Sequence, residues 1–370
     1  DTPKVSTFRT SHAMVDKLLR NIDWGQRGNF VNIPTDCPQR DERLGWMGDA
    51  QIFARTAALN RDVAAFFTKW LADVRDAQSA EGAFPDVAPN VPGMNDGAPA
   101  WGDAGVIVPW VMHEQYGDRR ILEQQYPAMV RFVSFIEREN PALLWKKRRS
   151  NDYGDWLSID AVTDKEMLAT AYFAGTTRLV ARVAETLGRK ADAARFGALA
   201  DRIRIAWNRA YVGNDGRIKG DTQTAYVLAL SFDLLSAPLR ATAARHLVDD
   251  IRKRGNHLST GFLGVGHLLP ALTEAGHLDV AYTLLEQDTF PSWGYSIKHG
   301  ATTIWERWDG WTKENGFQDA SMNSFNHYSL GSVGEWIAST VVGLAPAAPG
   351  WKRVRVAPRP GGTLNSARGT

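Results

Sequence analysis

Carboxylates and tryptophans stand together in two short segments. Asp36, Asp41, Glu42 and Asp49 fall within residues 36–49, and Glu306 lies far downstream. Hydrolysis of a glycosidic bond needs such groups, because one carboxylic acid protonates the leaving oxygen while a second carboxylate acts as base or nucleophile. Crowding among carboxylates helps the acid keep its proton near neutral pH. Flat aromatic faces bind sugar rings, so the two segments indicate chemistry on a carbohydrate.

The first segment also has structural interpretations. Residues 40–43, Arg-Asp-Glu-Arg, would suit a solvated run of ion pairs. The rigid Pro38 and the flexible Gly45 that flank the run are unusual for an exposed charged helix. Asp49 could be the N-cap of a helix that begins near Ala50.

The remaining candidates have structural alternatives too. Glu306 could form an ion pair with its neighbour Arg307, and His327, as a single histidine, could be a buried structural residue. Cys37 is a poor candidate nucleophile because the adjacent Asp36 disfavours the thiolate form.

Composition excludes several other classes of protein. The 43 basic and 41 acidic residues nearly balance, so we expect no nucleic-acid partner. A single cysteine excludes a disulfide within the chain. No apolar run reaches the roughly 18 residues of a membrane span, and the first residues lack the apolar core of a signal peptide. Histidines at metal-binding spacing, a P-loop and a GxSxG motif are all missing, so we expect no metal and no cofactor.

Apolar residues recur at spacings of three and four over most of the chain, which is the pattern of amphipathic helices. Residues 61–79 show it well, with Phe66, Phe67, Trp70 and Leu71. We expect helices over these approximate ranges: 6–22, 50–59, 61–79, 103–116, 118–138, 163–187, 190–211, 221–234, 237–254, 262–275, 277–288 and 329–342.

Short and long connections between these helices alternate strictly. The long segments are 23–49, 80–102, 139–162, 212–220, 255–261 and 289–328. Short links form antiparallel hairpins, so the alternation places every long segment at the same end. The sequence therefore predicts an all-α fold, an (α/α)6 barrel with inner and outer helices, whose long loops form the functional face.

The last residues follow a different pattern. Residues 350–358 read as a short β-strand, and Pro360-Gly361-Gly362 follows. We therefore divide the chain into an (α/α)6 barrel over residues 1–346 and the beginning of a C-terminal β-sandwich module over residues 347–370. The alternative is a strand that caps the barrel.

Three motifs resemble those of a known family. They are residues 36–49 (DCPQRDERLGWMGD), 154–157 (GDWL) and 302–308 (TTIWERW). Together they resemble the bacterial α-L-rhamnosidases, glycoside hydrolase family 78, and the resemblance extends from about Phe8 to Pro346. It implies an (α/α)6 barrel that removes terminal, non-reducing α-L-rhamnose from rhamnosides with inversion of configuration.

The resemblance also implies roles for individual residues. Glu42 would be the general acid and Glu306 the general base, with their carboxyl groups roughly 6.5–9.5 Å apart to leave room for water. Asp36 and Asp49 would hydrogen-bond the sugar hydroxyls, and tryptophan faces would surround the methyl group of the 6-deoxy sugar. The full set of implied substrate-binding residues is Asp36, Arg40, Trp46, Asp49, Trp101, Asp103, Trp156, Trp305 and His327.

Other interpretations stay open at this point. The barrel could belong to another inverting glycosidase that acts on α-L-fucosides or glucosides, to a polysaccharide lyase or sugar epimerase, or to a catalytically silent carbohydrate-binding protein. Full-length members of the resembled family carry β-modules before and after the barrel, so we expect this chain to be a catalytic-domain fragment. The aglycone, the compartment and the oligomeric state are not determined by the sequence.

Overall fold

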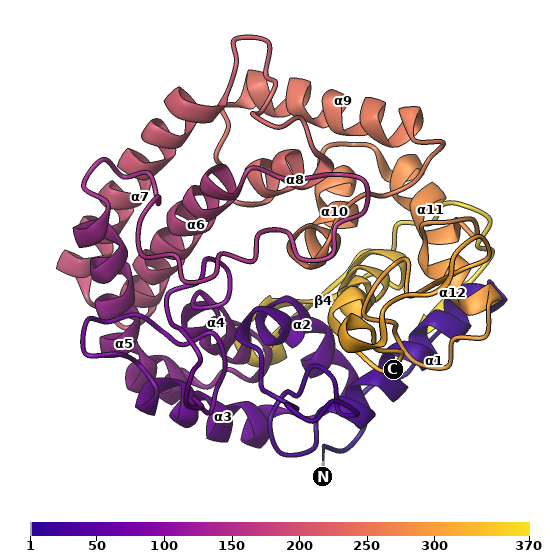
Figure 1. The fold of residues 1–370 in the computed structure, drawn as a ribbon, viewed down its shortest axis with the longest axis horizontal. Helices are drawn as coiled ribbons and strands as arrows, with labels where there is room; N and C mark the ends of the chain where they lie inside the picture. Colours follow the sequence, from indigo (N-terminus) through magenta and orange to yellow (C-terminus); the bar gives the residue numbers. More distant parts are fainter. Residues whose placement is uncertain (1) are drawn as a thin grey trace.

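The computed structural model describes residues 2–370, and two concentric rings of helices make up most of it (Figure 1). The inner helices are α2 (Met47–Asn60), α4 (Ala104–Tyr116), α6 (Lys165–Thr186), α8 (Gln223–Ser231) and α10 (Phe262–Glu274), and a mixed helical segment over residues 329–341 completes the ring. The outer helices are α1 (Ala13–Asn29), α3 (Ala64–Asp76), α5 (Arg119–Glu139), α7 (Lys190–Tyr211), α9 (Ala237–Lys253) and α11 (Leu278–Glu286). This confirms the expected (α/α)6 barrel.

Burial explains which helices lie inside. Eight of the nine residues of α8 are buried, whereas only five of the seventeen residues of α9 are. A helix that is apolar all round must be enclosed, and a helix with one apolar stripe can lie at the surface. The two rings therefore follow from the two kinds of helix pattern in the sequence.

Several helix boundaries differ from those expected. Residues 8–10 form strand β1 (Phe8–Thr10) rather than helix, because they pair with β6 (Ala367–Gly369) from the other end of the chain. The segment over residues 329–341 combines 3-10, α and π turns. Helix α2 begins at Met47, so Asp49 is its third residue and not its N-cap.

The long segments all lie at one end of the barrel, as expected. Each of them leads into the N-terminus of an inner helix, so the six share one face (Figure 1). The last long segment also contains the short helix α12 (Trp293–Lys298) and a small hairpin of β2 (Trp311–Thr312) and β3 (Gly316–Phe317).

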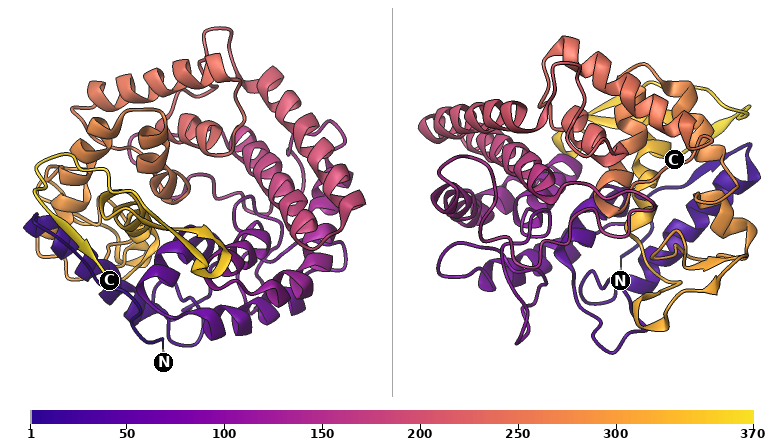
Figure 2. Two further views of the ribbon diagram at one scale, coloured as in Figure 1. Left: turned by 180° about the vertical axis from the view of Figure 1, so that it is seen from behind. Right: turned by 45° about the horizontal axis from the view of Figure 1, so that its top comes forward.

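The opposite end of the barrel contains a cavity of about 1030 Å³ lined by all the inner helices. The antiparallel hairpin of β4 (Leu344–Ala348) and β5 (Arg353–Val356) contributes residues to the lining of this cavity. Figure 2 shows the hairpin from behind the view of Figure 1. Inside, Arg55 and Glu114 form an ion pair at 2.6 Å. The assignment of residues 347–370 to a separate module stays a prediction.

Within the described residues, none of the helices is both long enough and apolar enough to cross a membrane.

A buried carboxylate ties the third long loop to helix α10. Asp155 is 7% exposed, and its oxygens accept hydrogen bonds from the backbone amides of the first turn of the helix, at distances of 2.8 to 3.2 Å. The hydroxyl of Thr224 in α8 donates a further bond at 2.5 Å. A negative charge at a helix N-terminus also interacts favourably with the helix dipole. Asp155 is therefore a structural anchor of this loop.

We expect Asp155→Ala to lower the free energy of unfolding by about 3 kcal/mol, because it leaves several buried donors without an acceptor. Denaturant unfolding of the purified variant measures this. The control is Asp118→Ala, which removes the N-cap of α5 and should cost about 1 kcal/mol. An equal or smaller loss in Asp155→Ala than in the control would contradict the anchoring role.

Candidate active site

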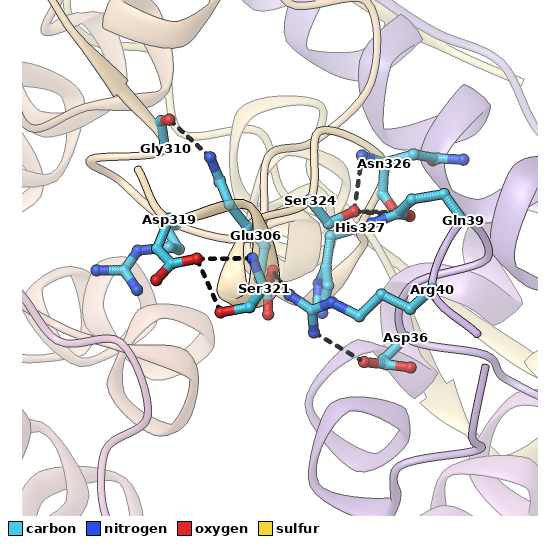
Figure 3. A network of polar contacts seen from close by, with 12 residues as sticks. Asp36, Gln39, Arg40, Glu306, Gly310, Asp319, Ser321, Ser324, Asn326 and His327 are labelled. Carbon is cyan, nitrogen blue, oxygen red and sulfur yellow. Dashed lines mark hydrogen bonds and ion pairs between the residues drawn. The ribbon is translucent and has the colours of Figure 1, made fainter. Parts of the chain in front are cut away.

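An ion pair joins the first long loop to the last on the face that the long loops form. Nη2 of Arg40 lies 2.7 Å from Oε2 of Glu306, and Nη1 of Arg40 lies 4.0 Å from Oδ2 of Asp36 (Figure 3). All three side chains are buried or nearly so. Residues that are 266 positions apart in the sequence therefore form one cluster.

Glu306 is held by backbone pairing within the last long loop. Its amide donates to the carbonyl of Ser324 at 2.9 Å, and the amide of His327 donates to Ile304 at 2.8 Å. The side chain is 2% exposed. The alternative that Glu306 pairs with Arg307 is wrong, because Arg307 forms its ion pair with Asp309 at 2.9 Å.

The run Arg40–Arg43 divides between the interior and solvent. Arg40 turns inward to Glu306, whereas Asp41, Glu42 and Arg43 are exposed. The loop closes on itself through a bond from the amide of Asp36 to the carbonyl of Leu44 at 3.2 Å. The interpretation as a solvated run of ion pairs is therefore wrong for Arg40, and the other three residues share only their exposure to solvent. An exposed Glu42 is accessible to a substrate that enters from this face.

Asp36 is a carboxyl group with a strongly perturbed pKa. Burial raises its pKa to about 7, and the negative charges of Asp49 and Glu42 act in the same direction. His327 and a hydrogen bond with Cys37 oppose the shift. Oδ1 of Asp36 is buried without a hydrogen-bond partner, so the protein leaves one oxygen of this carboxyl group unsatisfied.

His327 and Asp49 form a second buried pair beside this cluster. Nε2 of His327 lies 3.3 Å from Oδ1 of Asp49, which also accepts a bond from the hydroxyl of Ser329 at 2.9 Å. Burial lowers the pKa of His327, but the hydrogen bond to Asp49 and the charges of Asp49, Glu306 and Asp36 outweigh it, and the pKa is raised. The amide of Ser329 points at Nδ1 of the ring at 3.2 Å, which favours the tautomer with its proton on Nε2.

The donor atoms of Asp36, Cys37 and His327 lie within 4.8 Å of one another. They fit a metal ion poorly, because both nitrogens of His327 already face partners, Asp49 and Ser329. Burial also raises the pKa of the Cys37 thiol, so the thiol stays protonated. The same shift disfavours Cys37 as a nucleophile.

The aromatic residues of the first three long loops gather into one cluster. The rings of Trp46, Trp101 and Trp156 each contact Tyr153, with centroids 4.6 to 6.0 Å apart. Trp101 is 2% exposed and lies against Gly48 of α2, where a Cβ atom would stand 2.5 Å from the indole. Sequence reasoning missed Tyr153, although it directly precedes the Gly154-Asp155-Trp156 motif.

Two of the expected substrate-binding residues lie apart from these groups. Asp103 is fully buried, and its oxygens accept bonds from the amide of Ala100 and the hydroxyl of Thr176, while burial raises its pKa to about 6. Trp305 packs edge-on against Phe325 and lines a groove of about 320 Å³ whose walls include none of the clustered carboxylates. Their contact with substrate stays a prediction.

The sequence matches two models of known families. Residues 3–341 match the bacterial alpha-L-rhamnosidase six-hairpin glycosidase domain, and residues 343–370 match the bacterial alpha-L-rhamnosidase C-terminal domain. The chain belongs to the bacterial alpha-L-rhamnosidase six-hairpin glycosidase family. This confirms the resemblance that the three motifs indicated.

Individual relatives agree with the family assignment. An alpha-L-rhamnosidase of Streptomyces avermitilis is 52% identical over 368 residues, which cover all of this chain and 35% of that protein. The crystal structure of Streptomyces avermitilis alpha-L-rhamnosidase complexed with L-rhamnose superposes with a TM-score of 0.97 at 51% identity, over 100% of this chain and 35% of that one. The structure of the Aspergillus terreus enzyme gives 0.95 at 38% identity, over 100% and 44%. The chain thus spans about a third of the length of the Streptomyces avermitilis protein.

The raised pKa of Asp36 makes stability depend on pH. Between about pH 4 and 7 the folded protein keeps a proton on Asp36 that the unfolded chain has released, so this group destabilises the fold as pH rises. Asp36→Asn removes the effect. As pH rises from about 4 to 7, we expect the free energy of unfolding of Asp36→Asn to increase relative to that of wild type by up to about 4 kcal/mol.

Urea unfolding of both proteins at several pH values measures the difference. Asp118→Asn is the control, because its bonds with Arg120 lower the pKa of Asp118 and place its titration below the window. If the free energy of unfolding of Asp36→Asn relative to wild type changed with pH as little as that of Asp118→Asn, Asp36 would ionise normally in the folded protein.

Proposed function

We propose that this chain is the catalytic barrel of an α-L-rhamnosidase, which hydrolyses terminal α-L-rhamnosides with inversion of configuration. The ion pair between Arg40 and Glu306 carries the proposal, because it places a buried carboxylate against the first long loop, which carries Asp36 and Glu42. Membership of the six-hairpin glycosidase family and the rhamnose-bound Streptomyces relative support rhamnose as the sugar.

The proposed roles follow from the exposure of the two glutamates. Glu42 is exposed on the first loop, where it can protonate the glycosidic oxygen of a bound substrate. Glu306 is buried and held in place by its ion pair with Arg40, and its carboxylate can accept a proton from water. One carboxyl group gives a proton while the other takes one, which is the proton balance of an inverting hydrolysis.

The surrounding residues would hold the sugar. Oδ1 of Asp36, buried without a partner, is free to bond a hydroxyl group. Its raised pKa allows it to donate this bond near neutral pH. Arg40, Asp49 and His327 supply further polar donors and acceptors beside it. The aromatic cluster of Trp46, Trp101 and Trp156 would then cover the apolar side of the ring, as aromatic side chains do for amphipathic ligands.

A panel of p-nitrophenyl glycosides tests the reaction and the sugar together. We expect release of p-nitrophenol from the α-L-rhamnoside and little from the α-L-fucoside, α-D-mannoside and α-D-glucoside. Activity confined to another sugar would overturn the choice of substrate. If this chain cleaved none of them, the proposal that the barrel is catalytic by itself would fail.

Glu42→Gln and Glu306→Gln should each lower kcat by at least about a hundredfold, because each removes one half of the acid–base pair. Circular dichroism checks that the fold is retained. The control is Glu114→Gln at the opposite end of the barrel. Glu114 forms an ion pair with Arg55 at 2.6 Å, about as short as the pair of Glu306 with Arg40. We expect this variant to leave kcat nearly unchanged. A comparable loss in the control would attribute the effect of Glu306→Gln to the broken ion pair rather than to the loss of a base.

The configuration of the first product tests inversion. Proton NMR spectra recorded during rapid hydrolysis should show β-L-rhamnose first, followed by slow mutarotation to the equilibrium mixture. In Glu306→Gly, azide should restore turnover and yield the β-configured glycosyl azide, because a small anion can attack without a general base. An α-configured first product would assign a retaining mechanism instead.

A further inference from the structure

Tyr153 stands at the meeting point of three long loops. Its ring lies 4.6 Å from that of Trp101 in a tilted contact, 5.5 Å from Trp46 edge-on and 6.0 Å from Trp156 edge-on. Such arrangements are favourable and directional for aromatic pairs. No other residue in the described chain has ring contacts with all three of these tryptophans, so their relative positions depend on the placement of Tyr153.

The hydroxyl group of Tyr153 forms a hydrogen bond within the protein. It donates to Oδ2 of Asp86 at 2.8 Å, and the hydroxyl of Ser150 donates to the same oxygen at 2.7 Å. Asp86 is fully buried, and burial raises its pKa, while these two hydrogen bonds favour the carboxylate. A buried carboxylate that loses a donor becomes more costly to keep in the interior, so the bond restrains Tyr153 firmly.

Asp86 also belongs to the loop that supports Trp46. The carbonyl of Asp86 accepts a bond from the amide of Met47 at 3.0 Å, and Trp46 itself pairs with Val87 in an isolated β-bridge. The Tyr153–Asp86 bond therefore links the third long loop to the segment that carries Trp46. Removing the Tyr153 hydroxyl group should therefore shift the indole of Trp46 in the first long loop.

The backbone around Tyr153 adopts conformations that L-residues rarely take. Asp152 has φ of 45° and Gly154 has φ of 67°, so left-handed residues stand on both sides of the tyrosine. A non-glycine residue in this region costs on the order of 1 kcal/mol or more, and persists only where surrounding contacts impose it. Here Lys165 bonds the carbonyl of Asp152, and Asp155 bonds the start of α10. These contacts hold the loop in a conformation that places the Tyr153 ring against the tryptophans.

We propose that Tyr153 is a positioning and specificity-determining residue for the sugar pocket. It fixes the three indoles relative to one another, so that the partly exposed Trp46 and Trp156 form an apolar wall with the buried Trp101 packed against them. The only polar atom of its side chain bonds Asp86. Such a wall accepts the methyl group at C6 of a 6-deoxy sugar, whereas a hydroxymethyl group there would lose its hydrogen bonds to water without replacement. The inference rests on the proposed function and adds that Tyr153 selects 6-deoxy over 6-hydroxy sugars.

The test compares α-L-rhamnoside with α-L-mannoside, which differs only by a hydroxyl group at C6. Tyr153→Phe keeps the ring and releases it from Asp86. We expect KM for p-nitrophenyl α-L-rhamnoside to rise about five- to tenfold with kcat within about twofold, since Glu42 and Glu306 are untouched. The preference for rhamnoside over mannoside, measured as the ratio of kcat/KM, should fall several-fold, and further in Tyr153→Ala.

The matched control is Tyr126→Phe. Tyr126 is 3% exposed, and its hydroxyl bonds the carboxylate of Asp192 at 2.8 Å on the outer ring, far from the long loops. We expect the rhamnoside-to-mannoside ratio to stay at the wild-type value in this variant. A similar loss of selectivity in both variants would show that any broken tyrosine–carboxylate bond produces it, and would overturn the proposal.

Direct binding separates this inference from the proposed function. Quenching of tryptophan fluorescence by free L-rhamnose and L-mannose gives two dissociation constants without any turnover. Wild type should bind L-rhamnose more tightly, and Tyr153→Phe should lose most of the difference. An unchanged ratio of dissociation constants in a folded Tyr153→Phe overturns the role of Tyr153 even if hydrolysis is confirmed. A changed ratio without hydrolysis would leave the pocket in place and refute the catalytic proposal alone.

Discussion

The functional face depends on the ion pair between Arg40 and Glu306, because it holds together two loops at opposite ends of the barrel sequence. Each partner is largely removed from water, so neither charge can be left alone at small cost. The pair also sets the distance between the backbone of the first loop, which carries Asp36 and Glu42, and the paired segments that carry Glu306 and His327. The barrel provides the rigid frame in which such a contact between loops can be maintained.

Around this pair, buried carboxylates serve two different purposes. Asp103 and Asp155 accept bonds from backbone amides and hydroxyl groups, and they fix loops to helices. Asp36 retains an oxygen without a partner, and Glu42 stands in solvent. Residue type does not distinguish these groups. The difference lies in whether the protein itself supplies enough donors to satisfy each carboxylate.

Much of the fold was predictable from the sequence, and the errors have physical causes. The inner and outer helices followed from periodicity, and the strict alternation of short and long links placed the loops on one face. The first helix was predicted too early, because residues 8–10 pair with the last residues of the chain, a contact that no local pattern reveals. The alternative that Asp49 is an N-cap is wrong, because α2 begins two residues before it. The choice of Arg40 over Arg307 as the partner of Glu306 likewise needed three-dimensional coordinates.

The sequence by itself determined the class of the fold, the family and the segments in which the site residues lie, because periodicity and the long motif of residues 36–49 are local properties of the chain. Only the tertiary structure decided which charges meet, which carboxylates the protein already satisfies, and that Tyr153 joins three tryptophans from three loops. The physical reason is that hydrogen bonding, burial and pKa depend on neighbours that are distant in sequence. A residue's chemistry at this site is set by those neighbours as much as by its own side chain.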